Sequence, residues 1–121
     1  METPPSGPFM DKKVQVSITK FGDGISISVD PDPVPVKVGG QHKITWEMAA
    51  GSLPGWDFDE TAGIDVRNKN GKFHSPEGPK VIAKKFSWKN NADVVADYKY
   101  IINLTDGMNT YTLDPTIRNQ P

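Results

Sequence analysis

Residues 25–48 constrain the fold of this chain more than any other segment. Apolar and polar residues alternate through the segment, and the proline-rich residues 30–33 and the glycine pair 39–40 interrupt the alternation. A period of two residues places every second side chain on the same face of a β-strand. The segment therefore predicts three short strands with one buried face each. Pro35 predicts that the middle strand lies at a sheet edge, because proline cannot donate a ladder hydrogen bond.

Similar alternation occurs at residues 14–19 and 98–104, whereas residues 49–61 are predicted as a long loop and residues 81–88 as a strand. No window has a sustained helical period. Apolar runs separated by turn residues predict an all-β fold, namely a two-sheet antiparallel Greek-key sandwich of roughly seven to nine strands. A small β-barrel is the alternative.

The length of 121 residues fits one domain. Residues 1–10 are rich in proline, glycine and serine and are predicted to form a flexible tail, so that residues 11–121 form the domain. The absence of cysteine excludes disulfides, thiolate metal sites and cysteine nucleophiles. The first residues lack the apolar core of a signal peptide. The expected location is therefore cytoplasmic, with a periplasmic or secreted protein that has lost its leader as the alternative.

Three stretches together resemble cupredoxin-like domains: SVDPDPVPVKVGGQHKITWEM at residues 28–48, YKYII at 98–102, and DGM at 106–108. The same arrangement is broadly similar to immunoglobulin-like sandwiches. The C-terminal stretch, residues 113–119, resembles the end of small, uncharacterised bacterial β-sandwich proteins. The resemblance implies a Greek-key sandwich, and in cupredoxins it would also imply a copper centre.

A type 1 copper site requires a cysteine thiolate. The resemblance places that cysteine at Ile102, and no histidine follows in residues 103–109, so this centre is excluded. Met108 lies where the resemblance places the axial ligand. The alternative is a cysteine-free metal carrier, with copper as the metal, that uses His42, His74 and Met108. Otherwise both histidines are expected to be solvent-facing residues at strand ends.

Acidic and aromatic residues gather in the predicted loop, where Trp56, Asp57 and Asp59 are the candidate binding residues. Carboxylates on a loop suit Ca²⁺, or an acid–base pair of a glycosidase, but the spacing of a dedicated calcium loop is absent. Trp56 is either the stacking platform of a carbohydrate-binding module or a hydrophobic cap on one end of the sandwich.

The basic residues between positions 67 and 89 are interleaved with aromatic residues, a pattern that also occurs in single-strand nucleic-acid binding. Phe86 and Trp88 share one face of their predicted strand and are therefore expected in the core, and the net charge is only −1. No catalytic motif is present. We therefore predict a non-enzymatic binding or interaction module without a cofactor. Its partner is expected to be a protein, not nucleic acid or membrane, bound by loops or by an exposed sheet edge near Pro35.

Overall fold

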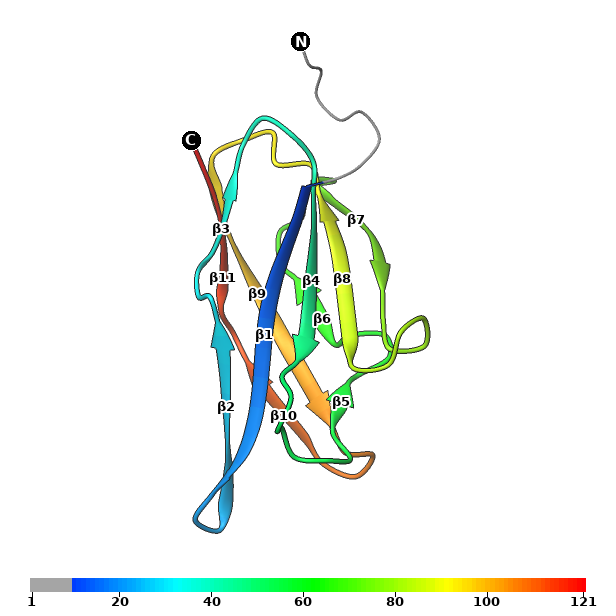
Figure 1. Cartoon of the computed structure of the whole chain (residues 1–121). Helices are drawn as coiled ribbons and strands as arrows, with labels where there is room; N and C mark the ends of the chain where they lie inside the picture. Colours follow the sequence, from blue (N-terminus) through cyan, green and yellow to red (C-terminus); the bar gives the residue numbers. More distant parts are fainter. Residues whose placement is uncertain (1–9) are drawn as a thin grey trace.

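The computed structural model describes residues 10–121. These residues form an all-β sandwich of two sheets, as the alternation predicts (Figure 1). The strands are β1 (Met10–Phe21), β2 (Gly24–Asp30), β3 (Val34–Lys37), β4 (His42–Met48), β5 (Asp57–Phe58), β6 (Ile64–Val66), β7 (Phe73–Glu77), β8 (Lys85–Asn90), β9 (Ala96–Thr105), β10 (Thr110–Leu113) and β11 (Thr116–Gln120). Most of the predicted N-terminal tail lies outside the described residues, and Met10, its last residue, already opens β1.

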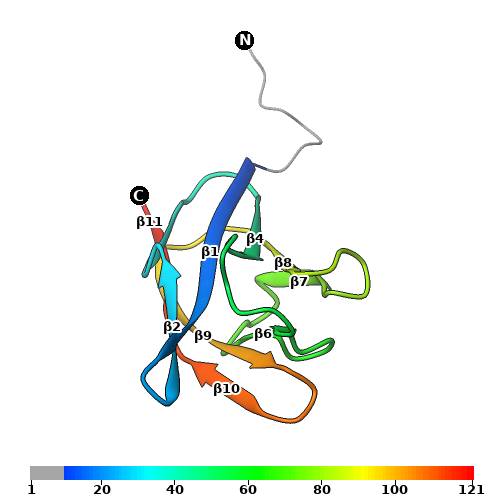
Figure 2. The ribbon, with the colours of Figure 1, turned by 60° about the horizontal axis from the view of Figure 1, so that its bottom comes forward.

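The first sheet has the strand order β2-β1-β4-β8-β7. The second has the order β10-β9-β11-β3, and β5 and β6 pair with the long strand β9 as well. The sheets are mixed and not purely antiparallel, because β1 pairs parallel with β4 and β3 pairs parallel with β11. The reason is that the chain leaves the first sheet after β2, runs along β3 in the second sheet, and returns as β4. Figure 2 shows the strands from a second direction.

The core lies between the two sheets and is built from the inward residues of the alternating strands. Val14 on β1 lies beside Trp46 on β4, and both side chains are fully buried. The Trp46 indole Nε1 donates a hydrogen bond to the hydroxyl of Tyr100 on β9, at 3.0 Å, and so joins the two sheets. Burial raises the pKa of the Tyr100 hydroxyl, which therefore stays protonated. A buried donor and its acceptor thus satisfy each other at the centre of the sandwich.

The β1–β2 hairpin extends beyond the part of the first sheet in which β1 also pairs with β4. β1 pairs with β4 over Met10–Val16 and with β2 over Gln15–Phe21, so its two halves have different neighbours. The hairpin turns at Gly22, whose φ of 60° favours glycine. Its tip extends beyond the other strands at the lower end of Figure 1.

No helix long and apolar enough to cross a membrane occurs among the residues that the structure describes.

Candidate functional site

The two histidines of the predicted metal site lie on opposite faces of the first sheet. His42 on β4 lies opposite Asn90, which lies opposite Phe73 on β7, and this row points into the core. His74 follows Phe73 and lies opposite Lys89 in the next row, so its side chain is on the outer face. A sheet therefore separates the two imidazoles, and the structure does not bring them together.

His42 is a buried histidine, with 4% of its surface exposed, and not the solvent-facing residue expected from the sequence. Its Nδ1 lies 3.0 Å from the carbonyl oxygen of Gly40, which accepts the hydrogen bond. Burial lowers the pKa of His42, and the positive charge of Lys12 lowers it further, against the opposing effect of the Gly40 hydrogen bond. The neutral imidazole is thus a structural group of the interior.

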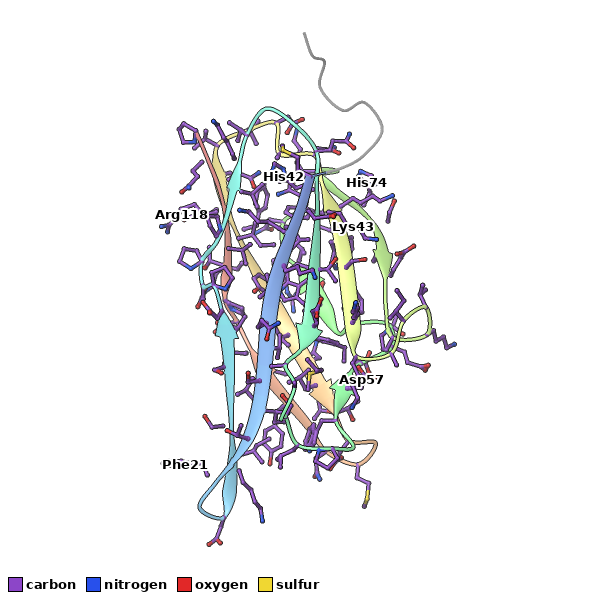
Figure 3. All side chains as sticks on the ribbon, in the orientation of Figure 1. Phe21, His42, Lys43, Asp57, His74 and Arg118 are labelled. Carbon is purple, nitrogen blue, oxygen red and sulfur yellow. The ribbon has the colours of Figure 1, made fainter. Side chains whose placement is uncertain are left out.

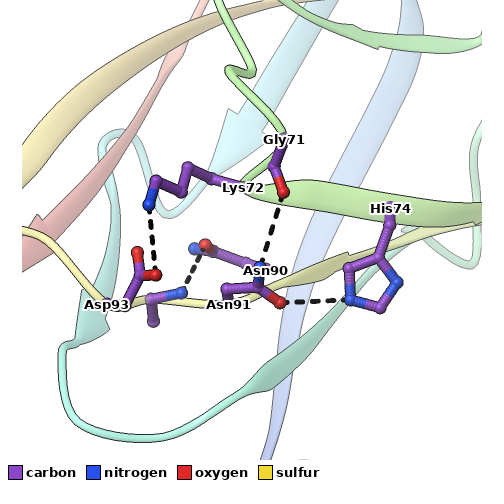
Figure 4. A network of polar contacts seen from close by, with 7 residues as sticks. Gly71, Lys72, His74, Asn90, Asn91 and Asp93 are labelled. Carbon is purple, nitrogen blue, oxygen red and sulfur yellow. Dashed lines mark hydrogen bonds and ion pairs between the residues drawn. The ribbon is translucent and has the colours of Figure 1, made fainter.

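His74 belongs to a hydrogen-bond network that ties β7 to the chain after β8 (Figure 4). Its Nε2 lies 3.2 Å from Oδ1 of Asn91, and Asn91 Nδ2 donates to the carbonyl oxygen of Gly71. Lys72 and Asp93 close the same network with an ion pair at 3.2 Å. The imidazole of His74 therefore helps to hold the loops at this end of the sandwich.

Met108, the third predicted ligand, lies on the turn between β9 and β10 with 92% of its surface exposed. This turn and the two histidines are at opposite ends of the molecule in Figure 3, where His42 and His74 are labelled. Within residues 10–121, no group of three or more histidine or acidic side chains has the arrangement of a metal site. Nothing in the geometry favours the metal carrier.

Trp56 lies immediately before β5 and is 7% exposed. Its ring packs against Tyr111 of β10, with the ring centroids 5.3 Å apart. The next apolar residue, Phe58, is also buried and packs edge-on against Phe86 of β8. The indole therefore closes one end of the sandwich and offers almost no open face to a sugar, so the structure lends the carbohydrate alternative no support.

The carboxylates beside Trp56 accept hydrogen bonds from backbone amides. Asp57 accepts hydrogen bonds from the amides of Phe58, at 2.7 Å, and Lys84, at 3.2 Å. Asp59 accepts from the amides of Thr61 and Ala62, at 3.1 and 2.8 Å, and so caps the turn before β6. Asp57 also borders an open hollow at this end. The carboxylate of Asp59 accepts only from its own loop, and its backbone amide donates to the carbonyl oxygen of Asn103 on β9, at 3.0 Å. Both carboxylates thus have structural partners.

The strands at the borders of the sheets differ in how they are protected. β7 contains Pro76 and an irregular register between His74 and Glu77. β3 lies at a sheet edge as predicted, and it carries both Pro35 and Lys37. β5, β6 and β10 are only two to four residues long. Proline, lysine, bulges and short length are the usual means of keeping a sheet edge from pairing with another chain.

β2 is the exception. It has seven residues, contains neither proline nor lysine, and keeps a continuous register with β1. Among the strands of residues 10–121 it pairs with β1 alone. Ile25, Ile27 and Val29 are partly buried against the core, while Ser26 and Ser28 are exposed. Its outer edge therefore offers an unprotected row of backbone donors and acceptors.

An exposed aromatic residue lies at the end of this edge. Phe21, the last residue of β1, is 77% exposed, and Figure 3 shows it at the lower end of the molecule. Its cross-strand neighbour is Gly24, which has no side chain to cover the ring. The sequence pattern located the open edge near Pro35 and did not single out Phe21. The absence of proline and lysine from residues 24–30 is the signal that would have indicated β2.

Within residues 10–121, the fold and this edge together define a class, that of all-β sandwiches with one border strand open to pairing. No protein-family model matches the chain, and no curated protein gives a significant match to it.

Proposed function

We propose that this protein is a non-enzymatic recognition module that binds an extended segment of a protein partner as an added strand along β2. The observation that carries the proposal is the contrast between β2 and the protected edges of β3 and β7. Strand addition is an established mode of peptide recognition, in which main-chain hydrogen bonds supply affinity and alternate side chains supply specificity.

The residues of β2 suit this mode. Its backbone is already held in extended geometry by seven register pairs with β1, so binding orders little of the receptor. The apolar row Ile25, Ile27 and Val29 would pack beside inward side chains of the added strand and remove further apolar surface from water. Phe21 supplies an aromatic anchor at one end, and aromatic anchors are enriched at protein interfaces.

The charges on the outer face of the first sheet support a protein partner over nucleic acid. Lys85 of the basic region lies 3.8 Å from Glu47, and Lys43 on the neighbouring strand β4 lies 3.7 Å from Glu77. Phe86 and Trp88, the aromatic residues among them, are buried in the core. Among residues 67–89, the basic side chains therefore have no exposed aromatic ring beside them of the kind that single-strand binding uses for stacking.

We also propose that the sandwich is cupredoxin-like or immunoglobulin-like and lacks a type 1 copper site. Ile102, at the position where the resemblance places the copper cysteine, is 1% exposed and packs in the core. This placement supports a scaffold whose copper position has been filled by an apolar side chain.

The proposed function is tested by selecting short extended peptides from a displayed library on the full chain. Bound peptides are mapped by amide hydrogen exchange at a protein concentration low enough to avoid self-association. We expect new protection confined to alternate amides of residues 24–30 and none on β3, which serves as the internal control. Failure to recover peptides, or protection only at other segments, would overturn the proposal.

A further inference from the structure

We infer that one strand that fits this edge is β2 of a second copy of the chain. The two copies would pair antiparallel about a two-fold axis at Ile27, which would join their five-stranded sheets into one. This inference rests on the proposed function, because it names the partner of the same edge. A two-fold interface requires a self-complementary surface, since each residue meets its symmetry-related counterpart.

The sequence of β2 is self-complementary in this register. Ile27 lies opposite Ile27 of the second copy, Ile25 lies opposite Val29, and Ser26 lies opposite Ser28. Every apolar side chain thus meets an apolar one on the core-facing side, and every serine meets a serine on the exposed side. Cross-strand pairs of this kind are the units that stabilise a sheet.

The residues around β2 favour this register over its neighbours. A shift of the symmetry centre toward the C-terminus would bring Pro31 into the ladder, where it cannot donate. A shift the other way would pair residues of the turn at Gly22. A shift of the pairing by one residue would place Ile27 opposite Ser28 and would turn the two apolar rows to opposite faces. The pairing centred on Ile27 avoids all three conflicts.

The charges around β2 do not oppose the contact. Residues 25–29 carry no charge, and Asp30 of one copy falls opposite Gly24 of the other and not opposite another acid. The chain has a net charge of only −1, so two copies repel each other weakly.

Phe21 extends the contact beyond the strand itself. It lies opposite Gly24, and Gly24 in turn would lie opposite Asp30 of the second copy. The exposed ring can therefore reach across the glycine to the end of the added strand. Stable interfaces bury about 800 Å² per partner. The two symmetry-related phenylalanines would therefore add buried surface area that the paired strands alone do not supply.

The inference is tested by introducing charges on β2 of the full chain. Ser26 and Ser28 are suitable positions, because they are exposed and can be replaced without disturbing the core. The double variant Ser26→Lys, Ser28→Lys places like charges opposite each other twice across the axis. The double variant Ser26→Lys, Ser28→Glu places opposite charges there instead. The control variant Thr110→Lys, Thr112→Lys adds two lysines to exposed positions of β10 in the other sheet.

Analytical ultracentrifugation gives the readout, with circular dichroism confirming that each variant is folded. We expect a concentration-dependent dimer for the wild type, a dissociation constant raised by at least about tenfold in the Lys/Lys variant, and near-wild-type association in the Lys/Glu and control variants. A monomeric wild type at high concentration, or equal weakening in the Lys/Lys and Lys/Glu variants, would overturn the second copy as partner.

The ultracentrifugation and the peptide selection together separate the two proposals. If the wild type is monomeric but selected peptides still protect residues 24–30, the second-copy inference fails and the proposed function stands. If neither a second copy nor any peptide protects these residues, both fail.

Discussion

The buried side chain of His42 makes the free energy of unfolding of this sandwich depend on pH. His42 lies between the sheets, and burial lowers its pKa below the value of 6.5 expected for an exposed histidine. Below that pH the unfolded chain binds more protons at this position than the folded chain does, so the free energy of unfolding falls as the pH falls. The fall begins near pH 6.5 and continues to the lower pKa of the folded state.

We therefore predict that His42→Gln flattens the pH dependence of stability in this range, as measured by urea denaturation between pH 7.5 and about pH 5. His74→Gln, on the outer face of the sheet, is the matched control for the removal of an imidazole. The lowered pKa values of Asp97 and Asp106 act in a separate range, because these carboxyls lose their stabilising charge only below about pH 4. An unchanged slope in His42→Gln would contradict the prediction.

At the scale of elements, the predicted loop 49–61 is more structured than its sequence indicates. β5 pairs with β9 at Phe58↔Leu104, and Trp56 and Phe58 are both buried. Two residues are too few for an alternating pattern, so only pairing with β9 identifies this strand. Conversely, the predicted strand 81–88 was partly wrong, because β8 begins at Lys85 and Val81 and Ile82 are exposed.

Gly63, just before β6, is required by close packing. A Cβ atom there would lie 2.6 Å from the Asp59 carbonyl oxygen, 2.7 Å from Phe58 Cβ and 2.8 Å from the Phe86 ring. We predict that Gly63→Ala lowers the free energy of unfolding by about 1–3 kcal/mol, as overpacking typically does. Gly24→Ala is the control, with its nearest atom at 3.8 Å, and should stay within about 0.5 kcal/mol of wild type. Chemical denaturation measures both, and equal stabilities would refute the packing argument.

At the scale of the whole molecule, all three tryptophans belong to the core. Trp46 is fully buried, and Trp56 and Trp88 are exposed by 7% and 9%. Trp88 also donates its Nε1 hydrogen bond to the carbonyl oxygen of Ile64, at 2.7 Å, in the second sheet. Aromatic residues thus contribute both apolar area and specific bonds between the two layers.

We predict a blue-shifted tryptophan emission that acrylamide and iodide quench weakly in the native state and strongly after denaturation. Oligosaccharides should leave the spectrum unchanged, because the Trp56 ring packs on Tyr111. A sugar-dependent change in fluorescence that disappears in Trp56→Ala would contradict this placement and restore the carbohydrate alternative.

The sequence by itself determined the fold class and the inward face of the long strands. The alternation at residues 14–18, 44–46 and 98–104 predicted buried rows that the structure confirms, because a period of two is a local property of the chain.

Only the tertiary structure decided which strands are neighbours, because pairing joins residues far apart in the chain. The parallel pairs β1–β4 and β3–β11 follow from the crossing between sheets, which no local pattern indicates. The register across β4, β8 and β7 placed His42 and His74 on opposite faces, although both lie beside turns in the sequence. Among residues 10–121, the order of strands likewise gives β2 a single neighbour, β1, because a strand lies at an edge only through the pairing of all the others.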